Sequence, residues 1–320
     1  MKPDQRIYTL ALNQQAPHVA AQYVSIAWML LGLVLPLQSQ PMLRYAPVAG
    51  EQRTFEIQID SRNSQSMRSA STNNEVTFST KTTLNDTLLI QDVNKTAFTG
   101  LLKYGAARVE VRGMAQLGLP DTTLTLPETR KIRQRISFSP QGVVLKREVL
   151  NSDTLSEAVR QFLSAGGSNV ETILSTIMPQ LPKNKPATLG TSWTETLSET
   201  PTLAIGTVKT TKKLAYTVTG VLDTLGMNCL RVNVSSISFV MKFDIKSQST
   251  DTSATAAMQG SGDGIIEGVL YLETGSRMLV ASQMRSVVNS RVEVSGAQTM
   301  SITAKQDIAT TARLSSRFVK

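Results

Sequence analysis

Beyond Pro41 the chain alternates apolar and polar residues in many short runs. Side chains that alternate with a period of two point to opposite faces of a β-strand, so each run predicts a strand with one buried face. Gly-rich breaks between the runs indicate antiparallel hairpins. The apolar positions of the clearest runs are Phe55, Ile57 and Ile59; Leu214, Tyr216 and Val218; Ile237, Phe239, Met241, Phe243 and Ile245; Ile265, Val269 and Tyr271; and Val292 and Val294.

The alternation changes parity once within the longest run. Val232 and Val234 occupy even positions, whereas the apolar series that starts at Ile237 occupies odd positions. An extra residue in a strand turns all later side chains to the other face of the sheet. We therefore expect a β-bulge at Ser235 and Ser236.

Residues 154–178 have a helical period instead. Two capping boxes, one at Thr154 with Glu157 and one at Ser168 with Glu171, would each satisfy free amides at a helix start. A Gly pair separates the two segments, and Pro179 ends the second. The apolar positions that would share a helix face are Leu155, Val159, Phe162 and Leu163, then Val170, Ile173, Leu174, Ile177 and Met178. This pattern predicts an amphipathic helix pair.

These elements together predict a mainly β fold. We expect a large curved antiparallel sheet, similar to a half-barrel, with the helix pair at its centre. The expected segments are residues 1–40, a β-rich segment over 41–150, the helix pair over 151–182, and a second β-rich segment over 183–320. Length alone allows one large β domain or two ordinary domains in 320 residues.

The first forty residues resemble an export segment. Residues 23–37 contain no charged side chain and follow a polar leader that carries Lys2 and Arg6. Fifteen apolar residues suit the core of a signal peptide better than a membrane span, which needs about 20. A retained N-terminal anchor and a buried helix of the fold remain as alternatives. The expected location is the periplasm or another extracytoplasmic compartment.

Residues that carry common catalytic chemistry are scarce. His18 is the single histidine and Cys229 the single cysteine. If the leader is removed, the mature chain has no histidine, which excludes Ser-His-Asp and Cys-His catalysis and histidine-bearing zinc sites. We expect Cys229 to be buried as a small apolar residue. From the sequence we expect no cofactor, no metal and no enzymatic activity. The alternative is a hydrolase built from converging carboxylates.

The chain is basic, with a formal net charge of +9. Its densest basic run contains Arg130, Lys131, Arg133 and Arg135. In a strand the last three of these side chains would share a solvated face opposite Ile132 and Ile136. An anionic membrane surface is the alternative partner for this run. Nucleic acid is not expected, because no aromatic residues are interleaved for base stacking.

A glycine-rich run spans residues 260–264 with glycine at every second position. A phosphate-binding loop would need a helix start directly after it, to supply backbone amides and a favourable dipole. The residues that follow have the pattern of a strand instead. We therefore expect a hairpin turn or the entry to a strand.

Several turn and strand residues resemble a family of uncharacterised exported bacterial proteins. The family has no established activity, so this resemblance implies no chemistry. The expected layout is also similar to that of the periplasmic lipoprotein carriers, in which a curved half-barrel sheet holds acyl chains under helices. The residues that carry the first resemblance are Tyr45, Pro47, Gly50, Arg53 and Phe55, then Gly190 and Trp193, then Gly260, Gly262, Gly264, Gly268, Leu270, Tyr271, Leu272 and Gly275.

We expect the protein to be a non-catalytic protein of the cell envelope that binds a lipid-like or otherwise apolar ligand in a groove of the curved sheet. Met-containing apolar surfaces adapt readily to such ligands. The helix pair would then form a lid over the groove. The alternative is a structural or interaction domain in which the pair simply covers the core. The candidate ligand-binding residues are Phe162, Ile173, Ile177, Phe239, Met241 and Phe243.

Overall fold

A computed structural model of the chain describes residues 41–69, 73–151, 154, 174, 176–200, 202–203, 206–247, 256–295 and 300–319. Residues Met42–Lys320 form one compact unit, to which all elements below belong. The expected export segment, residues 1–40, lies outside the described residues.

The named elements of the described part of the unit are strands and two short 3-10 helices. The 3-10 helices are η1 (Met114–Leu117) and η2 (Pro127–Lys131). The strands are β1 (Gln52–Arg68), β2 (Asn73–Val93), β3 (Phe98–Lys103), β4 (Ala107–Arg112), β5 (Thr122–Leu126), β6 (Arg133–Phe138), β7 (Val144–Val149), β8 (Ser192–Glu199), β9 (Thr202–Leu203), β10 (Gly206–Thr224), β11 (Met227–Ser247), β12 (Ala256–Glu273), β13 (Leu279–Ser295) and β14 (Met300–Phe318).

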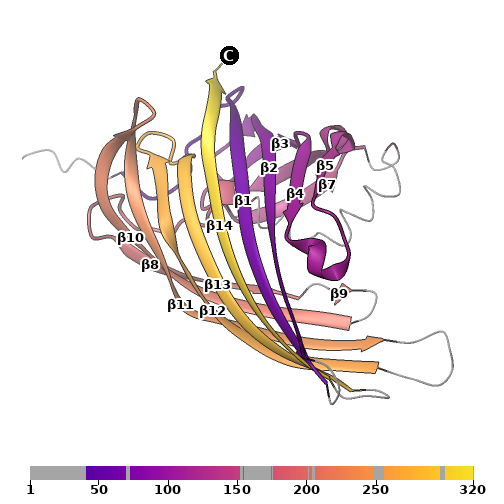
Figure 1. Cartoon of the computed structure of the whole chain (residues 1–320). Coiled ribbons are helices and arrows are strands. Elements are labelled where there is room, and N and C mark those ends of the chain that lie inside the picture. The colour runs from indigo at the N-terminus through magenta and orange to yellow at the C-terminus, as the bar shows by residue number, and fades with distance from the viewer. Residues whose placement is uncertain are drawn as a thin grey trace, which may run out of the picture. The chain divides into compact units, whose positions relative to one another are not determined.

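These strands form one antiparallel sheet. Its order is β7-β6-β3-β2-β1-β14-β13-β12-β11-β10-β8, while β4 pairs with β2 and β5, and β9 pairs with β10. The first long strand therefore lies beside the last, and the two β-rich segments of the sequence build a single sheet. Figure 1 shows β1 and β10–β14 bending together along their length. The prediction of a large, curved antiparallel sheet is confirmed.

Most of the predicted helix pair lies outside the described residues, and the structure does not support the pair as an element of the sheet. Of residues 154–178, only 154, 174 and 176–178 are described, so Phe162 and Ile173 lie outside the described chain. Within the described chain the named helical elements are the two 3-10 helices. The end of this region and the chain just after it contribute to packing, because Ile177, Met178 and Leu181 are buried in the core.

The hydrophobic core lies against one face of the sheet, near the start of β1 and the end of β14. Phe55 and Ile57 of β1 are fully buried there, whereas Glu56 between them is exposed. Burial of each such side chain contributes roughly 1.5–3 kcal/mol. Tyr45, from the segment before β1, contacts Phe98 edge-on at 6.0 Å between ring centroids, and Phe98 stacks on Phe138 at 5.1 Å. The core thus draws on both sequence ends of the sheet and on its β3–β6 side.

The predicted bulge in β11 is confirmed. The register between β11 and β12 shifts between Ser235 and Val240. The hydroxyl of Ser236 accepts a hydrogen bond from the backbone N–H of Ile266 at 2.8 Å, so a side chain replaces a missing ladder bond. After the shift Phe239 is buried, while Ile237 within the bulge is 54% exposed.

The glycine-rich run lies in the first part of β12 (Ala256–Glu273), so of the two expected settings the hairpin turn is wrong and the strand is found. Gly260, Gly262 and Gly264 alternate with polar residues and point to the same face as the core. A Cβ atom at Gly264 would lie 2.4 Å from Cδ1 of Phe239, and one at Gly260 would lie 2.3 Å from the carbonyl oxygen of Arg291. Neighbouring strands and side chains therefore approach this face of β12 too closely for any larger residue.

Candidate ligand-binding face of the sheet

The face that carries the core continues well beyond it along the long strands. Strand pairing places residues of successive strands in rows across the sheet. One row contains Phe243, Gly260, Val292, Ile302 and Met67, and apart from the glycine each member is apolar. We call the side chains of this face outside the packed core the distal core face. Its apolar members are Ile59, Met67, Val76, Phe78, Phe239, Met241, Phe243, Met258, Ile266, Met284, Val288, Val292, Val294, Ile302, Ala304 and Ile308.

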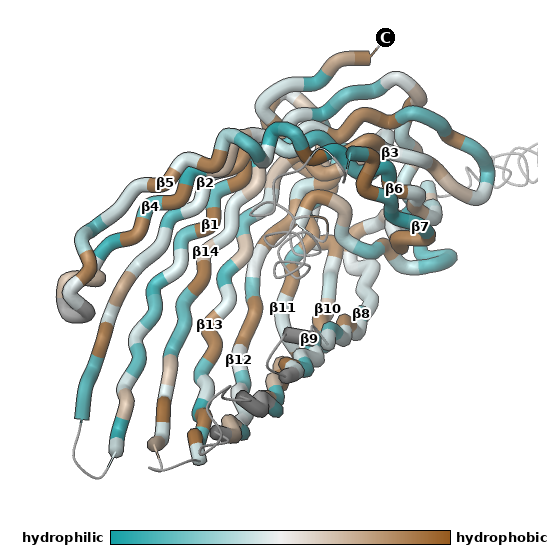
Figure 2. Tube along the Cα trace, turned by 90° about the vertical axis from the view of Figure 1, so that its right-hand side faces the viewer, coloured by the Kyte–Doolittle hydropathy of each residue, from teal (hydrophilic) through white to brown (hydrophobic). Residues whose placement is uncertain are grey.

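The polar members of the distal core face are nearly all uncharged. They include Ser61, Asn63, Gln65, Thr80 and Gln306, which sit between the apolar rows. Figure 2 shows apolar and polar positions, which include residues of both faces, along β1 and β12–β14. Hydroxyl and amide groups can accept or donate hydrogen bonds, but they do not impose the desolvation cost that a buried charge would.

Beyond the packed core, a charged residue lies on the distal core face at β10, and its charge is compensated. Lys212 of β10 forms an ion pair with Glu199 of β8, with 3.8 Å between Nζ and the carboxylate oxygen. Its ammonium group also lies 5.6 Å from the centroid of the Phe239 ring. A cation over an aromatic ring is attracted by the ring quadrupole. The flank of the face is therefore polar but electrically balanced.

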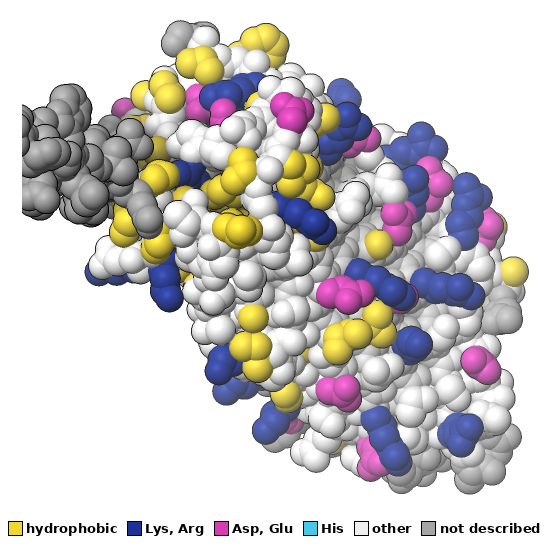
Figure 3. Space-filling view, turned by 90° about the vertical axis from the view of Figure 1, so that its left-hand side faces the viewer, with side chains coloured by type: hydrophobic (Ala, Val, Ile, Leu, Met, Phe, Trp, Pro, Cys, Tyr) yellow, Lys and Arg dark blue, Asp and Glu magenta, His cyan; other side chains and the backbone are white. Residues whose placement is uncertain are grey.

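The opposite face of the same strands carries charges of both signs. Arg285 of β13 and Asp307 of β14 form an ion pair at 2.7 Å on this face. Lys242, Asp263 and Arg291 also belong to it, because their strand positions alternate with those of the distal core face. Figure 3 shows basic and acidic side chains interspersed over this side of the sheet. The two faces of one sheet thus differ sharply in chemistry, as expected when only one of them avoids water.

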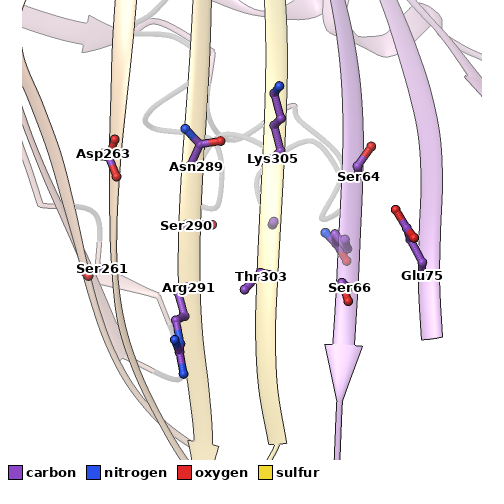
Figure 4. Close-up of a pocket in the computed structure, with 12 residues that line it drawn as sticks. Ser64, Ser66, Glu75, Ser261, Asp263, Asn289, Ser290, Arg291, Thr303 and Lys305 are labelled. Atoms are coloured by element: carbon purple, nitrogen blue, oxygen red, sulfur yellow. The ribbon is translucent and has the colours of Figure 1, made fainter. Parts of the chain in front are cut away.

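A shallow depression of about 450 Å³ lies mostly on the charged face. It crosses β12, β13, β14 and β1, and its side chains include Asp263, Asn289, Lys305 and Ser64, which belong to one row (Figure 4). Glu75 and Arg291 also line it. Its lining of hydroxyls, amides and opposed charges suits water and ions rather than an apolar ligand.

Three of the residues predicted from the sequence lie together on the distal core face. Phe239 is buried, and Met241 and Phe243 are half-buried on the same face of β11. Ile177 is fully buried in the core. Sequence reasoning missed the contributions of neighbouring strands, such as Phe78 and Ile302. Their strands also alternate, but the register that aligns them with β11 is a property of the folded sheet.

Cys229 has the environment expected for a buried apolar residue. Its side chain is fully buried, and its thiol donates to the carbonyl oxygen of Met227 at 3.3 Å. Burial and the nearby Glu273 carboxylate raise the pKa of the thiol to about 11. The thiolate form that acts as a nucleophile is therefore scarce at neutral pH.

The basic run near residue 130 is only partly a strand. Arg130 and Lys131 belong to η2, and Arg133 and Arg135 are exposed on β6. Ile132 and Ile136 are fully buried, as predicted for the opposite face. Arg135 lies 3.7 Å from Glu148 of β7, so part of its charge is compensated within the sheet.

The described residues contain neither a metal-binding cluster nor a membrane-spanning helix. No group of three or more histidine, cysteine or acidic side chains converges there to hold a metal ion. The helical segments described are too short or too polar to cross a bilayer.

Comparison with known proteins identifies no family. No family model matches the chain, and no curated protein matches it either. The resemblance to uncharacterised exported proteins therefore stays a prediction.

Some solved structures share a partly similar arrangement of strands. A structure of lipovitellin that describes its lipid–protein interactions matches with a TM-score of 0.41 and 11% identity. The match covers 85% of this chain and 26% of the lipovitellin chain. The outer membrane protein OprG from Pseudomonas aeruginosa has a TM-score of 0.24 and 7% identity, covering 88% and 99%. A DUF1329 family protein from Desulfovibrio piger has a TM-score of 0.13 and 10% identity, covering 81% and 85%. This chain thus spans about a quarter of the lipovitellin chain.

Proposed function

We propose that the protein is a non-catalytic binding protein whose distal core face takes up a lipid-like, largely apolar ligand. The observation that carries this proposal is the difference between the two faces of the same strands. Apart from Asp86, Arg53 and Glu195 near the packed core, one face is mainly apolar and carries the compensated Lys212–Glu199 pair on its flank. The other face carries charges of both signs. A sheet with two solvated faces would have no physical reason for such a division.

The chemistry of the distal core face suits acyl chains. Each methylene group removed from water contributes about 0.8 kcal/mol, so a long chain laid along several apolar rows would gain substantial free energy. Met67, Met241, Met258 and Met284 are unbranched and polarizable, which allows the surface to adapt to chains of different shape. The serine, threonine and amide side chains between the rows can hydrogen-bond ester or hydroxyl groups of a ligand.

A pair of valines on opposite faces of β13 provides a matched test. Val292 lies on the distal core face and Val287 on the charged face, and both are half-buried. Val292→Lys introduces a charge where the ligand would lie, so uptake of a fluorescent fatty-acid probe by delipidated protein should fall at least tenfold. Val287→Lys should leave uptake within about twofold of the wild type.

Two outcomes would count against the proposal. Equal loss of uptake in both variants would indicate general destabilisation, and no uptake by the wild-type protein at micromolar concentration would favour a structural or interaction domain. Circular dichroism of each variant serves as the control for folding.

The location of the protein is part of the same proposal. We propose that it acts outside the cytoplasm, on the basis of the uncharged run at residues 23–37. Intact-mass measurement of native material should give a chain that starts between about residues 38 and 41. A full-length chain recovered from the cytoplasm would contradict this.

A further inference from the structure

The sheet branches where β2 changes its partner strand. Residues 79–83 of β2 pair with β4, whereas residues 87–93 pair with β3. The chain that connects β3 to β4 crosses this branch point, and the N–H of Gly105 donates to Oδ1 of Asp86 at 3.0 Å. A Cβ atom at Gly105 would lie 2.2 Å from the carbonyl oxygen of Asn85, so the connection between β3 and β4 packs tightly against the backbone of β2.

Three buried polar atoms near this branch point have no hydrogen-bond partner among the described residues. They are Oδ2 of Asp86, the hydroxyl oxygen of Tyr104 and Nε2 of Gln134. Asp86 and Gln134 are fully buried, and Tyr104 is 7% exposed. An unsatisfied buried polar group costs about 1–3 kcal/mol, so three in one region would be a large penalty for a folded protein.

Strand pairing brings these three groups to the same part of the core face. Thr87 pairs with Lys103, which places Asp86 beside Tyr104 at the end of β3. Gln134 of β6 pairs with Leu102 of β3, in the row next to Tyr104. Residues in adjacent rows of one face are within reach of long side chains.

The orientation of the Gln134 amide is fixed by a neighbour. Its Oε1 accepts a hydrogen bond from Nε of Arg147 at 3.0 Å, so its NH2 group must point away from Arg147. The free atoms then comprise an amide donor, a hydroxyl that can donate or accept, and a carboxyl oxygen. This is a complementary set for a molecule that both donates and accepts hydrogen bonds.

We propose that the branch point is a site for internal water, held by Asp86, Tyr104 and Gln134. Water donates to the carboxyl oxygen, accepts from the amide and bonds the phenol hydroxyl, so it satisfies all three groups at once. Buried waters typically make about three hydrogen bonds to groups of this kind and form part of the structure. The site lies where β3 and β4 separate, so the water would brace the connection between them.

A crystal structure of the wild-type protein, at a resolution that shows ordered water, tests this directly. We expect density within hydrogen-bond distance of the three atoms, retained with one partner fewer in Tyr104→Phe, which removes only the hydroxyl. An empty site, or a direct hydrogen bond between Tyr104 and Asp86, would overturn the proposal.

Urea unfolding supplies a second test that does not depend on crystals. If water links the groups, Tyr104→Phe and Gln134→Met should be non-additive, and the double variant should unfold at a higher urea concentration than the two separate shifts predict. Additive shifts would show that the two side chains act independently, which the proposal does not allow.

Discussion

At the scale of single residues, the buried carboxyl groups are the clearest departures from ordinary chemistry. Burial raises the pKa of Asp86 to about 6, and the hydrogen bond from Gly105 only partly offsets this. Burial also raises the pKa of Glu195, although Tyr216 donates a hydrogen bond to its carboxylate at 2.8 Å. Neither residue could have been singled out from the sequence, because both occur in ordinary alternating runs.

Asp86 should make stability depend on pH. Its pKa is higher in the folded protein than the value of 3.8 expected for the unfolded chain, so folding favours its protonated form. The contribution of Asp86 to the free energy of unfolding is fully present below about pH 4 and is lost as the pH rises through about 6. The free energy of unfolding should fall by about 3 kcal/mol over this range. Urea unfolding of the wild type and Asp86→Asn across pH 4 to 7 measures it, since the variant lacks this titration. Parallel curves for the two proteins would contradict the assignment.

Gly264 should tolerate no larger residue. A Cβ atom there would lie 2.4 Å from Phe239 and 2.7 Å from the carbonyl oxygen of Val287, and the latter cannot move without shifting β13. Gly264→Ala should therefore lower the free energy of unfolding by about 1–3 kcal/mol. Gly220→Ala is the matched control, because a Cβ atom at Gly220 has no neighbour within 4 Å. Equal effects of the two substitutions in thermal unfolding would show that the crowding at β12 does not matter.

At the scale of elements, a buried ion network fastens the ends of β1, β12 and β14 together. Arg53 is fully buried and donates to Glu51 at 2.8 Å, to the carbonyl oxygen of Leu279 at 3.2 Å, and to Glu273. Arg317 of β14 contacts the same two carboxylates, Glu51 at 2.8 Å and Glu273 at 2.7 Å. Two arginines and two carboxylates thus compensate one another where the first and last long strands meet.

Removing the central arginine should destabilise the fold strongly. Arg53→Met keeps most of the volume but leaves two carboxylates with Arg317 as their remaining cation, and a broken buried pair costs about 3 kcal/mol. Arg285→Met removes an exposed pair with Asp307 and should change little. Chemical unfolding of both variants compares them. A similar, small effect of the two would show that the Arg53 network is not a structural anchor.

Strands were more predictable than the elements that join them. The period-two runs of β1, β10, β11 and β13 and the bulge at Ser235 follow directly from alternation and its change of parity. At Gly260 the sequence left a hairpin turn and a strand entry open, because glycine in a strand has the same local signature as glycine in a turn. The close approach of neighbouring strands, such as the 2.3 Å between a Cβ atom at Gly260 and the carbonyl oxygen of Arg291, explains why β12 needs glycine there.

At the scale of the whole molecule, the sheet order could not be predicted. Alternation indicates that a strand has one buried face but not which strand lies beside it. The pairing of β1 with β14 joins residues more than 200 positions apart, such as Ile57 and Ala312. For the same reason, only part of the candidate site could be predicted from the sequence. Phe239, Met241 and Phe243 lie on one strand, whereas Val292 and Ile302 come beside them only through strand pairing.

The central claim is that a lipid-like ligand lies on the distal core face. A photoactivatable fatty acid, cross-linked to the delipidated protein and mapped by peptide mass spectrometry, tests it most directly. The account predicts adducts on core-face residues such as Met241, Phe243, Val292 and Ile302, and their loss when unlabelled fatty acid competes. Adducts concentrated on charged-face residues such as Asn289, Arg291 and Lys305, or adducts that competitor does not reduce, would contradict it.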